Sequence, residues 1–431
     1  MDLTTIMLGS IFKKSEFNKH VLTLITGTAV AQVIPIFLSP VLRRIITLEE
    51  YAVFEVYFRI ISILAILAAG RYPMAIVLPK TKESAENVLG LSCIVSIAFN
   101  LLLMIPIALF GKDILTFINI PPSYLFTLYW IPLGILLITN GNAINFWFVR
   151  QKAFTSASTN KVIHKAAESS AWLISGLTKL SGGLIYGDII GRLIQNIVGW
   201  WQCKKAALDL NNVSIAKMKE VAKTYYEYPT FNAIPAVLNT CSLMLPVIII
   251  NKYFDASTTS NIGLAIQILG LPLALISTSV SQVFYERVAT LKKESKRVLP
   301  ALWQLFVQLL LLGISGVVVV YLFAPTIFTF VYGNEYIQSG IFAQILVVSI
   351  AIKFAVSPLS MVFPALDKIK IGSLWQAGYF CIILILFQFV HHSIEEFLYI
   401  YVGLEIIAYV LYLLLIVFAA KKHDETLEQH I

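Results

Sequence analysis

Apolar segments long enough to cross a membrane recur along this chain, separated by short polar stretches. The hydrocarbon core of a bilayer is about 30 Å thick, so a spanning helix needs roughly 20 apolar residues. On this criterion the pattern predicts an all-α membrane protein with about twelve transmembrane helices. The predicted spans are 21–42, 51–69, 88–110, 124–143, 162–180, 183–201, 231–251, 261–283, 299–323, 341–363, 371–390 and 397–419.

The fifth span is the weakest of the twelve. His164, Lys165 and Glu168 near its start would also suit an amphipathic helix that lies in the membrane interface. An interfacial helix would leave eleven crossings, and every later basic loop would then lie on the outer side. We therefore expect the fifth span to cross the membrane.

The first span has a competing interpretation as a signal peptide. Lys13, Lys14 and Lys19 precede an apolar run, and Ala29-Val30-Ala31 resembles a cleavage site. The apolar run continues beyond that point to residue 42, which is long enough for a full crossing. An uncleaved first helix is the better prediction.

The basic residues alternate from loop to loop. The N-terminal stretch, every second gap between spans and the C-terminal tail hold 23 of the 32 Lys and Arg residues, whereas the other gaps hold four and the spans five. Basic loops stay on the cytoplasmic side of a membrane protein. This asymmetry predicts a multi-pass membrane protein with both termini in the cytoplasm.

Composition agrees with this topology. The chain is 58% hydrophobic and only 13% charged, whereas soluble proteins are about a quarter charged. The net charge of +8 follows from the basic loops, so it indicates contact with anionic membrane lipids and not with nucleic acid. The four cysteines are isolated, and we find no metal-ligand spacing, phosphate-binding loop or nucleophile motif. We expect no metal, no cofactor, no catalytic residue and no enzyme activity.

The longest stretch outside the predicted spans divides the chain into two halves. It runs from Gln202 to Thr230 and carries five lysines. We predict an N-terminal six-helix bundle over 1–203, a cytoplasmic linker over 204–230, and a C-terminal six-helix bundle with a short tail over 231–431. Six spans are an even number, so both halves enter the membrane in the same direction, as in a parallel repeat.

Polar residues and prolines share one face of the first helix in each half. Gln32 lies on this face with Pro35 in the first half, and Asn239 lies with Pro235 in the second. Unsatisfied polar groups are costly in lipid, so these faces point at protein or at water. Polar contacts between packed helices would explain them. The alternative is that Gln32 and Asn239 line a cavity between the halves and contact a substrate.

Ionisable residues inside the spans require an explanation, because each costs at least about 2.5–3.5 kcal/mol to insert. Glu55 with Arg59, and Asp188 with Arg192, are spaced by four and form candidate ion pairs on one helix face. Such pairs either assist insertion or serve function. Lys353 has no acidic residue within one helical turn, which favours an inward-facing cation.

Seen together, the membrane cations predict a site for an anionic headgroup. Arginine binds phosphate through paired hydrogen bonds and lysine as a point charge. The candidate substrate-binding residues are Arg59, Arg192, Lys353, Arg43, Arg44, Arg71, Gln32 and Asn239. The candidate ion-coupling carboxylates are Glu55, Asp188 and Glu405, the last of which would otherwise pair with Lys353.

Four segments resemble the bacterial oligosaccharide flippases, which move lipid-linked O-antigen or other polysaccharide repeat units. These segments are Leu22–Arg44, Tyr72–Ser92, Tyr228–Tyr253 and Leu269–Ala289. The resemblance implies the fold of the multidrug/oligosaccharidyl-lipid/polysaccharide exporter superfamily, a MATE-like pair of six-helix bundles around a central cavity. It also implies that cavity cations, here Arg59, Arg192 and Lys353, hold the diphosphate of an undecaprenyl-linked glycan.

The function expected from the resemblance is a flippase of the bacterial inner (cytoplasmic) membrane. It would move an undecaprenyl-diphosphate-linked oligosaccharide from the cytoplasmic to the outer leaflet by alternating access, coupled to H⁺ or Na⁺. Its expected partners are that lipid, the surrounding membrane lipids and other membrane proteins of polysaccharide assembly. A multidrug/cation antiporter is the first alternative, but it needs an anionic cavity. A polysaccharide polymerase or ligase is the second, but it needs a long outer loop with catalytic groups.

Overall fold

Helices account for nearly all of the described chain. The computed structural model describes the backbone of residues 16–428 and the side chains of 27–271, 276–277 and 280–427. Residues 16–428 contain no strand, so the prediction of an all-α protein is confirmed. Lys13 and Lys14 of the basic N-terminal stretch lie outside the described residues.

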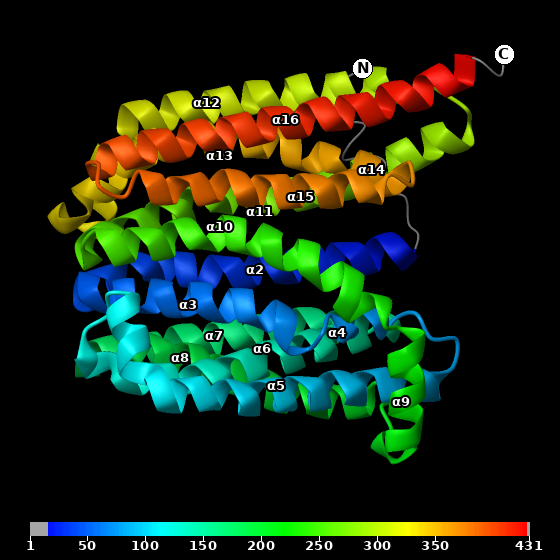
Figure 1. Cartoon of the computed structure of the whole chain (residues 1–431), viewed down its shortest axis with the longest axis horizontal. Coiled ribbons are helices and arrows are strands. Elements are labelled where there is room, and N and C mark those ends of the chain that lie inside the picture. The colour runs from blue at the N-terminus through cyan, green and yellow to red at the C-terminus, as the bar shows by residue number, and fades with distance from the viewer. Residues whose placement is uncertain (1–15, 429–431) are drawn as a thin grey trace. The chain divides into compact units, whose positions relative to one another are not determined.

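The first compact unit of the chain ends at Ile234. Its long helices run side by side, and shorter elements join them at their ends (Figure 1). The long helices are α2 (Glu16–Ile45), α3 (Leu48–Ala68), α5 (Lys82–Phe117), α6 (Leu125–Arg150), α7 (Phe154–Thr178) and α8 (Gly183–Lys205). The shorter elements are α4 (Tyr72–Ala75), η1 (Pro122–Tyr124), η2 (Leu210–Asn212), α9 (Ile215–Thr224) and the π-helical turn η3 (Tyr228–Asn232).

The second unit begins at Pro235 and is built in the same way. Its long helices are α10 (Ala233–Tyr253), α11 (Ala256–Lys293), α12 (Leu299–Tyr332), α13 (Ile337–Val356), α15 (Ile369–Leu384) and α16 (Ile394–Glu428). The short elements are η4 (Asn334–Tyr336), η5 (Ser357–Met361), α14 (Val362–Ala365) and η6 (Ile385–Gln388). Each predicted span therefore has most of its residues on one of these long helices. The span 341–363 continues from α13 through η5 into α14, and the span 371–390 continues from α15 through η6.

Three of the long helices are more polar than the rest. Within the described residues, nine helical segments have both the length and the hydropathy to cross a membrane, and α7, α8 and α11 are not among them. These three have 25, 23 and 38 residues, so they are long enough to span. A helix that carries polar groups crosses lipid only where other helices cover those groups. Packing against neighbouring helices, and not hydropathy alone, therefore makes α7, α8 and α11 suitable for a membrane.

Helix α7 is a member of the bundle along most of its length. A Cβ atom added at Gly27 of α2 would meet the Cβ of Ser158, and one added at Gly176 of α7 would meet the side chain of Ile45. Since Ser158 and Gly176 lie near the two ends of α7, this helix runs alongside α2. That placement supports a crossing helix over one that lies in the membrane interface.

Glycines on α8 allow α7 to approach closely. Gly183, Gly187 and Gly191 recur every four residues and so lie on one face of α8. An added Cβ at Gly191 would lie 2.7 Å from the Cβ of Glu168 and 3.0 Å from its backbone atoms. Small residues at this spacing let membrane helices pack backbone to backbone. The close approach brings the carboxylate of Glu168 next to α8.

We expect Gly191→Ala to destabilise the protein, because the new methyl group has no space against α7. Overpacking of this kind costs about 1–3 kcal/mol. Thermal unfolding of the purified protein in detergent measures the effect. Gly316→Ala is the matched control, since nothing lies within 4 Å of its added Cβ. Equal melting temperatures for the two variants would contradict the close packing.

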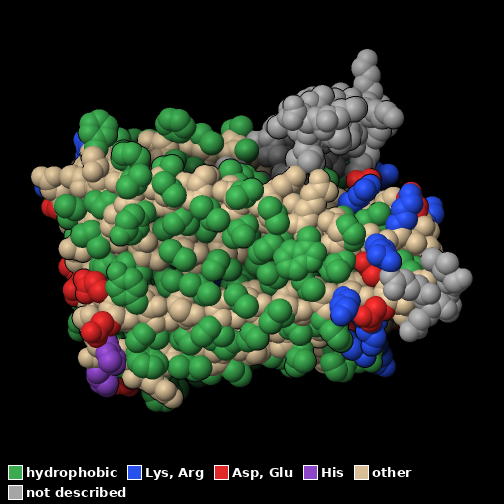
Figure 2. All heavy atoms as spheres, turned by 90° about the horizontal axis from the view of Figure 1, so that it is seen from above, with side chains coloured by type: hydrophobic (Ala, Val, Ile, Leu, Met, Phe, Trp, Pro, Cys, Tyr) green, Lys and Arg blue, Asp and Glu red, His purple; other side chains and the backbone are tan. Residues whose placement is uncertain are grey.

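Lysines and arginines gather at one end of each unit, which we call the basic end. In the first unit, three segments meet there: the loop 76–81, the end of α6 and residue 206. Arg150 of α6 donates to carbonyl oxygens of the loop, and Trp147 of α6 donates to Ala206 O at 3.2 Å. On the face drawn in Figure 2, hydrophobic side chains form a wide band, and Lys and Arg side chains gather beyond one edge. A hydrophobic band of this kind is the surface expected to face lipid.

Candidate functional site

A cavity with two arginines in its wall lies inside the first unit. Its volume is about 330 Å³, and its wall is formed by residues of α3, α4, α6 and α8 with the loop that joins α3 to α4. Arg71 and Arg192 contribute the charged groups, and Ser62, Thr139 and Asn142 contribute neutral polar groups. No carboxylate is among the described residues of the wall. The cavity therefore suits an anionic ligand.

Arg71 reaches the cavity from the turn between α3 and α4. Gly70 and Arg71 both have a positive φ, 54° and 58°, which allows the sharp reversal of the chain there. The Nε of Arg71 donates a hydrogen bond to Oδ1 of Asn232 at 3.1 Å. Partial burial lowers the pKa of Arg71 from its ordinary value. Because its hydrogen-bond partner Asn232 is neutral, burial makes an anionic ligand beside this guanidinium favourable.

Arg192 is shared between the cavity and an acidic residue one turn earlier on α8. Its Nε donates to the two carboxylate oxygens of Asp188 at 2.9 and 2.8 Å. The hydroxyl of Tyr57 on α3 donates to Asp188 Oδ2 at 3.4 Å. Asp188 is fully buried, so this network is a strong neutralised pair. The guanidinium nevertheless remains in the wall of the cavity.

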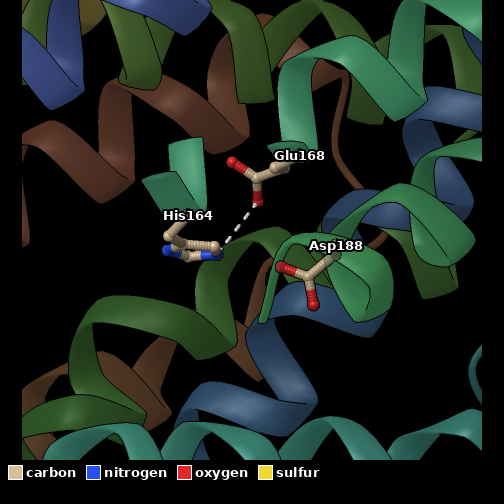
Figure 3. Close-up of side chains that lie close together, drawn as sticks. All are labelled: His164, Glu168 and Asp188. Atoms are coloured by element: carbon tan, nitrogen blue, oxygen red, sulfur yellow. Dashed lines mark ion pairs between the residues drawn. The ribbon is translucent and has the colours of Figure 1, made fainter. Parts of the chain in front are cut away.

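Two acids and a histidine meet behind Arg192, between α7 and α8 (Figure 3). One possible ligand atom from each of His164, Glu168 and Asp188 lies within 4.8 Å of the others. Glu168 is 1% exposed, and Lys165 Nζ pairs with it at 2.5 Å. Since a cation already neutralises each carboxylate, the cluster suits a mobile proton better than a divalent metal ion.

Glu55 and Arg59 form a second buried pair on α3. Arg59 donates to Glu55 Oε2 at 2.8 Å, and both residues are 8% exposed. Neither residue is in the wall of the cavity. The spacing of four predicted this pairing, and the structure shows it. The pairing favours a structural role for Arg59 over contact with a substrate.

Arg43 and Arg44 differ in their surroundings although they are adjacent. The guanidinium of Arg43 is buried and lies over the ring of Tyr51, 3.5 Å from its centroid. Arg44 is exposed. Neither contributes to the wall of the cavity that holds Arg71. Their assignment as substrate contacts stays a prediction.

Lys353 lies in the second unit, in a pocket of aromatic side chains. Its ammonium pairs with the carboxylate of Glu405, which also accepts a hydrogen bond from the hydroxyl of Tyr379. The rings of Tyr401 and Tyr409 lie 5.9 and 5.7 Å from Lys353 Nζ. Glu405 is 1% exposed. This geometry favours a buried ion pair that joins α13 to α16.

We expect Lys353→Met to reduce the amount of folded protein, because it leaves the Glu405 carboxylate buried without its cation. Breaking one partner of a buried pair costs about 3–5 kcal/mol. The double variant Lys353→Met with Glu405→Gln is expected to recover most of the loss. Fluorescence-detected size exclusion of the variants measures it. A Lys353→Met protein as abundant and as monodisperse as the natural one would contradict the structural role of this pair.

Gln32 and Asn239, the polar candidates on α2 and α10, are both half-buried. The Oε1 of Gln32 is shielded from solvent, with no hydrogen-bond partner among the described residues. Neither residue is in the wall of the cavity with Arg71. Their roles in substrate binding also stay predictions.

Sequence reasoning missed several residues that the fold brings to this site. The sequence pattern uses Glu168 only as an argument against a membrane crossing by the fifth span. It does not identify Tyr57 or Asn142 as candidate site residues. The four-residue recurrence of glycine on α8 was the available signal, since it marks the face against which α7 packs. An acid on α7 opposite that face is then buried beside α8.

Comparison with known proteins supplies the family and the fold. A family model described as "Polysaccharide biosynthesis protein" matches residues 41–340. No curated protein matches the chain in sequence. Solved structures resemble this chain in fold, and their sequence identity to it is low.

Three solved structures illustrate that fold. One is an inward-facing multidrug resistance MATE family transporter of the MOP superfamily, with a TM-score of 0.70, 14% identity and coverage of 94% of this chain and 96% of that chain. Another is the lipid II flippase MurJ in an inward closed conformation, with a TM-score of 0.70, 14% identity and coverage of 95% and 89%. A third is a MOP superfamily transporter from Pyrococcus furiosus whose description notes reverse polarity of its binding pocket, with a TM-score of 0.65, 14% identity and coverage of 95% and 96%. The MATE-like fold is thereby confirmed.

Proposed function

Because the chain belongs to the polysaccharide biosynthesis protein family, we propose that it flips an undecaprenyl-diphosphate-linked oligosaccharide from the cytoplasmic to the outer leaflet. One observation carries the proposal: the cavity of the first unit presents Arg71 and Arg192 with no carboxylate in its described wall. A diphosphate is the part of such a lipid that two guanidinium groups recognise. The similar MurJ structure is that of a lipid II flippase, and the flipping of a lipid supports this proposal.

The same cavity has surfaces for the rest of the headgroup. Phe58 and Phe146 present aromatic side chains, and Ser62 and Asn142 present hydrogen-bonding groups. A few polar groups on a mostly apolar wall are typical of small-molecule sites. In the proposed mechanism the diphosphate binds at the arginines and the first sugar packs near the aromatic rings. The polyprenyl tail stays in the lipid.

The coupling ion in this proposal is a proton carried by Asp188. While Asp188 is ionised, it holds Arg192 through the bonds at 2.9 and 2.8 Å. Protonation removes that charge, and the guanidinium of Arg192 becomes available to the diphosphate in the cavity. Glu168 and His164 lie beside Asp188 and would pass the proton on. Proton binding and substrate binding then favour the same state of the site.

The proposal disfavours the two alternatives. A multidrug/cation antiporter requires negative charge where its ligand binds, and the described wall of this cavity offers positive charge. A polymerase or ligase requires room for catalytic groups outside the membrane. The loops opposite the basic ends are short within the described chain. The longest runs from residue 385 to residue 393 and includes the short helix η6.

Reconstituted protein tests the function directly. Proteoliposomes that contain undecaprenyl-diphosphate-linked oligosaccharide are mixed with a membrane-impermeant glycosidase, and the fraction of cleaved glycan is measured with time. Flipping is expected to expose the protected half of the glycan when a proton gradient is imposed. Replacing Na⁺ with K⁺ is expected to change nothing. Exposure equal to that of protein-free vesicles would refute the proposal.

A further inference from the structure

A basic groove lies at the basic end of the first unit, apart from the cavity described above. Its volume is about 550 Å³, and it lies between the loop after α4 and the end of α6. Four of the seven residues in its wall are cationic: Lys80, Lys82, Arg150 and Lys152. No acidic residue is among its described wall residues, and it shares no wall residue with the cavity of Arg71 and Arg192.

Arg150 gives the groove a fixed shape. Its guanidinium donates to the carbonyl oxygens of Ile76 and Val77, both at 3.3 Å, and to that of Thr81 at 3.0 Å. These bonds hold the loop after α4 against the end of α6. The acceptors are neutral carbonyls, and one buried carboxylate, that of Glu86, acts on both Arg150 and Lys82. The four cations of the groove therefore keep a net positive charge.

The lysines of the groove are less neutralised than three other lysines at the basic ends. Within the described chain, neither Lys80 nor Lys152 has a carboxylate within ion-pair distance, and Lys82 is 3.5 Å from Glu86. Other lysines pair closely with acids. These pairs are Lys217 with Glu83, Lys292 with Asp367, and Lys296 with Glu294. The general excess of lysine on the cytoplasmic side explains the number of cations at the basic end. It does not explain why four of them line one groove whose described wall holds no acidic residue.

Apolar side chains beside the groove indicate the kind of anion. Val77, in the wall, is 36% exposed, and the next residue, Leu78, is 52% exposed. Exposed apolar residues beside lysines are typical of a segment at the membrane surface, where the lysines reach the headgroups. We propose that the groove binds the phosphate headgroup of an anionic glycerophospholipid, whose acyl chain packs against Val77 and Leu78. The site is separate from the substrate cavity and does not depend on the proposed transport function.

Native mass spectrometry of the purified full-length protein in detergent tests the proposal. Phosphatidylglycerol, phosphatidylcholine and glycerol phosphate are the three probes. The groove variant replaces Lys80, Lys82 and Lys152 with glutamine and keeps Arg150. The matched control replaces Lys204, Lys219 and Lys223 with glutamine, which are exposed lysines of the first unit outside the groove. Both variants lose the same charge.

The groove variant is expected to bind phosphatidylglycerol at least tenfold more weakly, and the control variant within about twofold of the natural protein. Phosphatidylcholine is expected to bind weakly to all three proteins. Equal losses in the two variants would show bulk electrostatic attraction and overturn the site. Glycerol phosphate that competes as well as the lipid would assign the groove to a soluble phosphate and overturn the lipid assignment.

A single substitution guards against misfolding of the triple variant. Lys80→Glu changes one exposed side chain and is expected to weaken phosphatidylglycerol binding at least threefold. Its thermal unfolding is expected to match that of the natural protein. Unchanged lipid binding by this folded variant would also overturn the proposal.

Discussion

Replacing Arg71 with alanine is expected to lower glycan export by about 10- to 100-fold while the amount of protein in the membrane stays unchanged. Arg71 lies in the cavity wall, where no described carboxylate balances it. A hydrogen bond to a charged group contributes about 1.5–3 kcal/mol, and each 1.4 kcal/mol is about tenfold in binding. Surface glycan in a deletion strain that expresses the variant, normalised to protein amount, measures the effect.

Three controls separate phosphate recognition from other effects of Arg71→Ala. Arg44→Ala removes an exposed arginine outside the cavity wall, so export is expected to stay within about twofold. Arg71→Lys keeps the charge but loses the paired geometry, and export should be intermediate. Asn232→Ala removes the hydrogen-bond partner of Arg71 and should reduce export less than Arg71→Ala. Normal export by Arg71→Ala at normal protein level would exclude the arginine from substrate binding.

Replacing Asp188 with asparagine is expected to make export insensitive to a proton gradient. The variant cannot ionise at this position, so no carboxylate at position 188 neutralises Arg192 in the cavity wall. Substrate binding should persist, whereas the gradient-driven rate should fall to that measured without a gradient. Glycan exposure in proteoliposomes with and without an imposed pH difference measures the change. A full response to the gradient in this variant would remove Asp188 from the coupling mechanism.

Stability measurements distinguish this coupling role from a merely structural ion pair. Asp188→Asn leaves the largely buried Arg192 without its counter-charge. Removing one partner of a buried ion pair lowers the free energy of unfolding by about 3–5 kcal/mol. The double variant Asp188→Asn with Arg192→Gln is expected to regain thermal stability but not export. The equally spaced pair of Glu55 and Arg59 is the matched control, because neither lies in the cavity wall. Its double neutralisation, Glu55→Gln with Arg59→Gln, is expected to retain export.

The predicted spans and the helices agree because hydropathy is a local property. Segments such as 299–323 and 397–419 lie within α12 and α16, although both helices extend further. A helix continues past the hydrocarbon core wherever its residues still favour helix, so hydropathy underestimates its length. The pattern of apolar segments predicted that α7, α8 and α11 cross the membrane, and the charge alternation supported the crossing of α7. Hydropathy and length together do not select these three helices.

The sites required more than local information. The spacing of four correctly paired Glu55 with Arg59 and Asp188 with Arg192, since such pairs lie on one helix face. The partner of Lys353 is Glu405, 52 positions away, and the pairing was only one of two possibilities considered from the sequence. Arg71 was predicted as a substrate-binding residue, but its contact with Asn232 joins residues 161 positions apart.

The sequence by itself determined that this chain is an all-α membrane protein, because apolar length and the distribution of lysine and arginine act on each helix separately. Tertiary structure alone decided which charges share a space. Glu168 meets Asp188 only because glycines let α7 approach α8, and Arg71 and Arg192 share a cavity wall only because α4 and α8 pack on α6. Such contacts depend on helix packing over long sequence separations, and no periodicity within one helix contains that information.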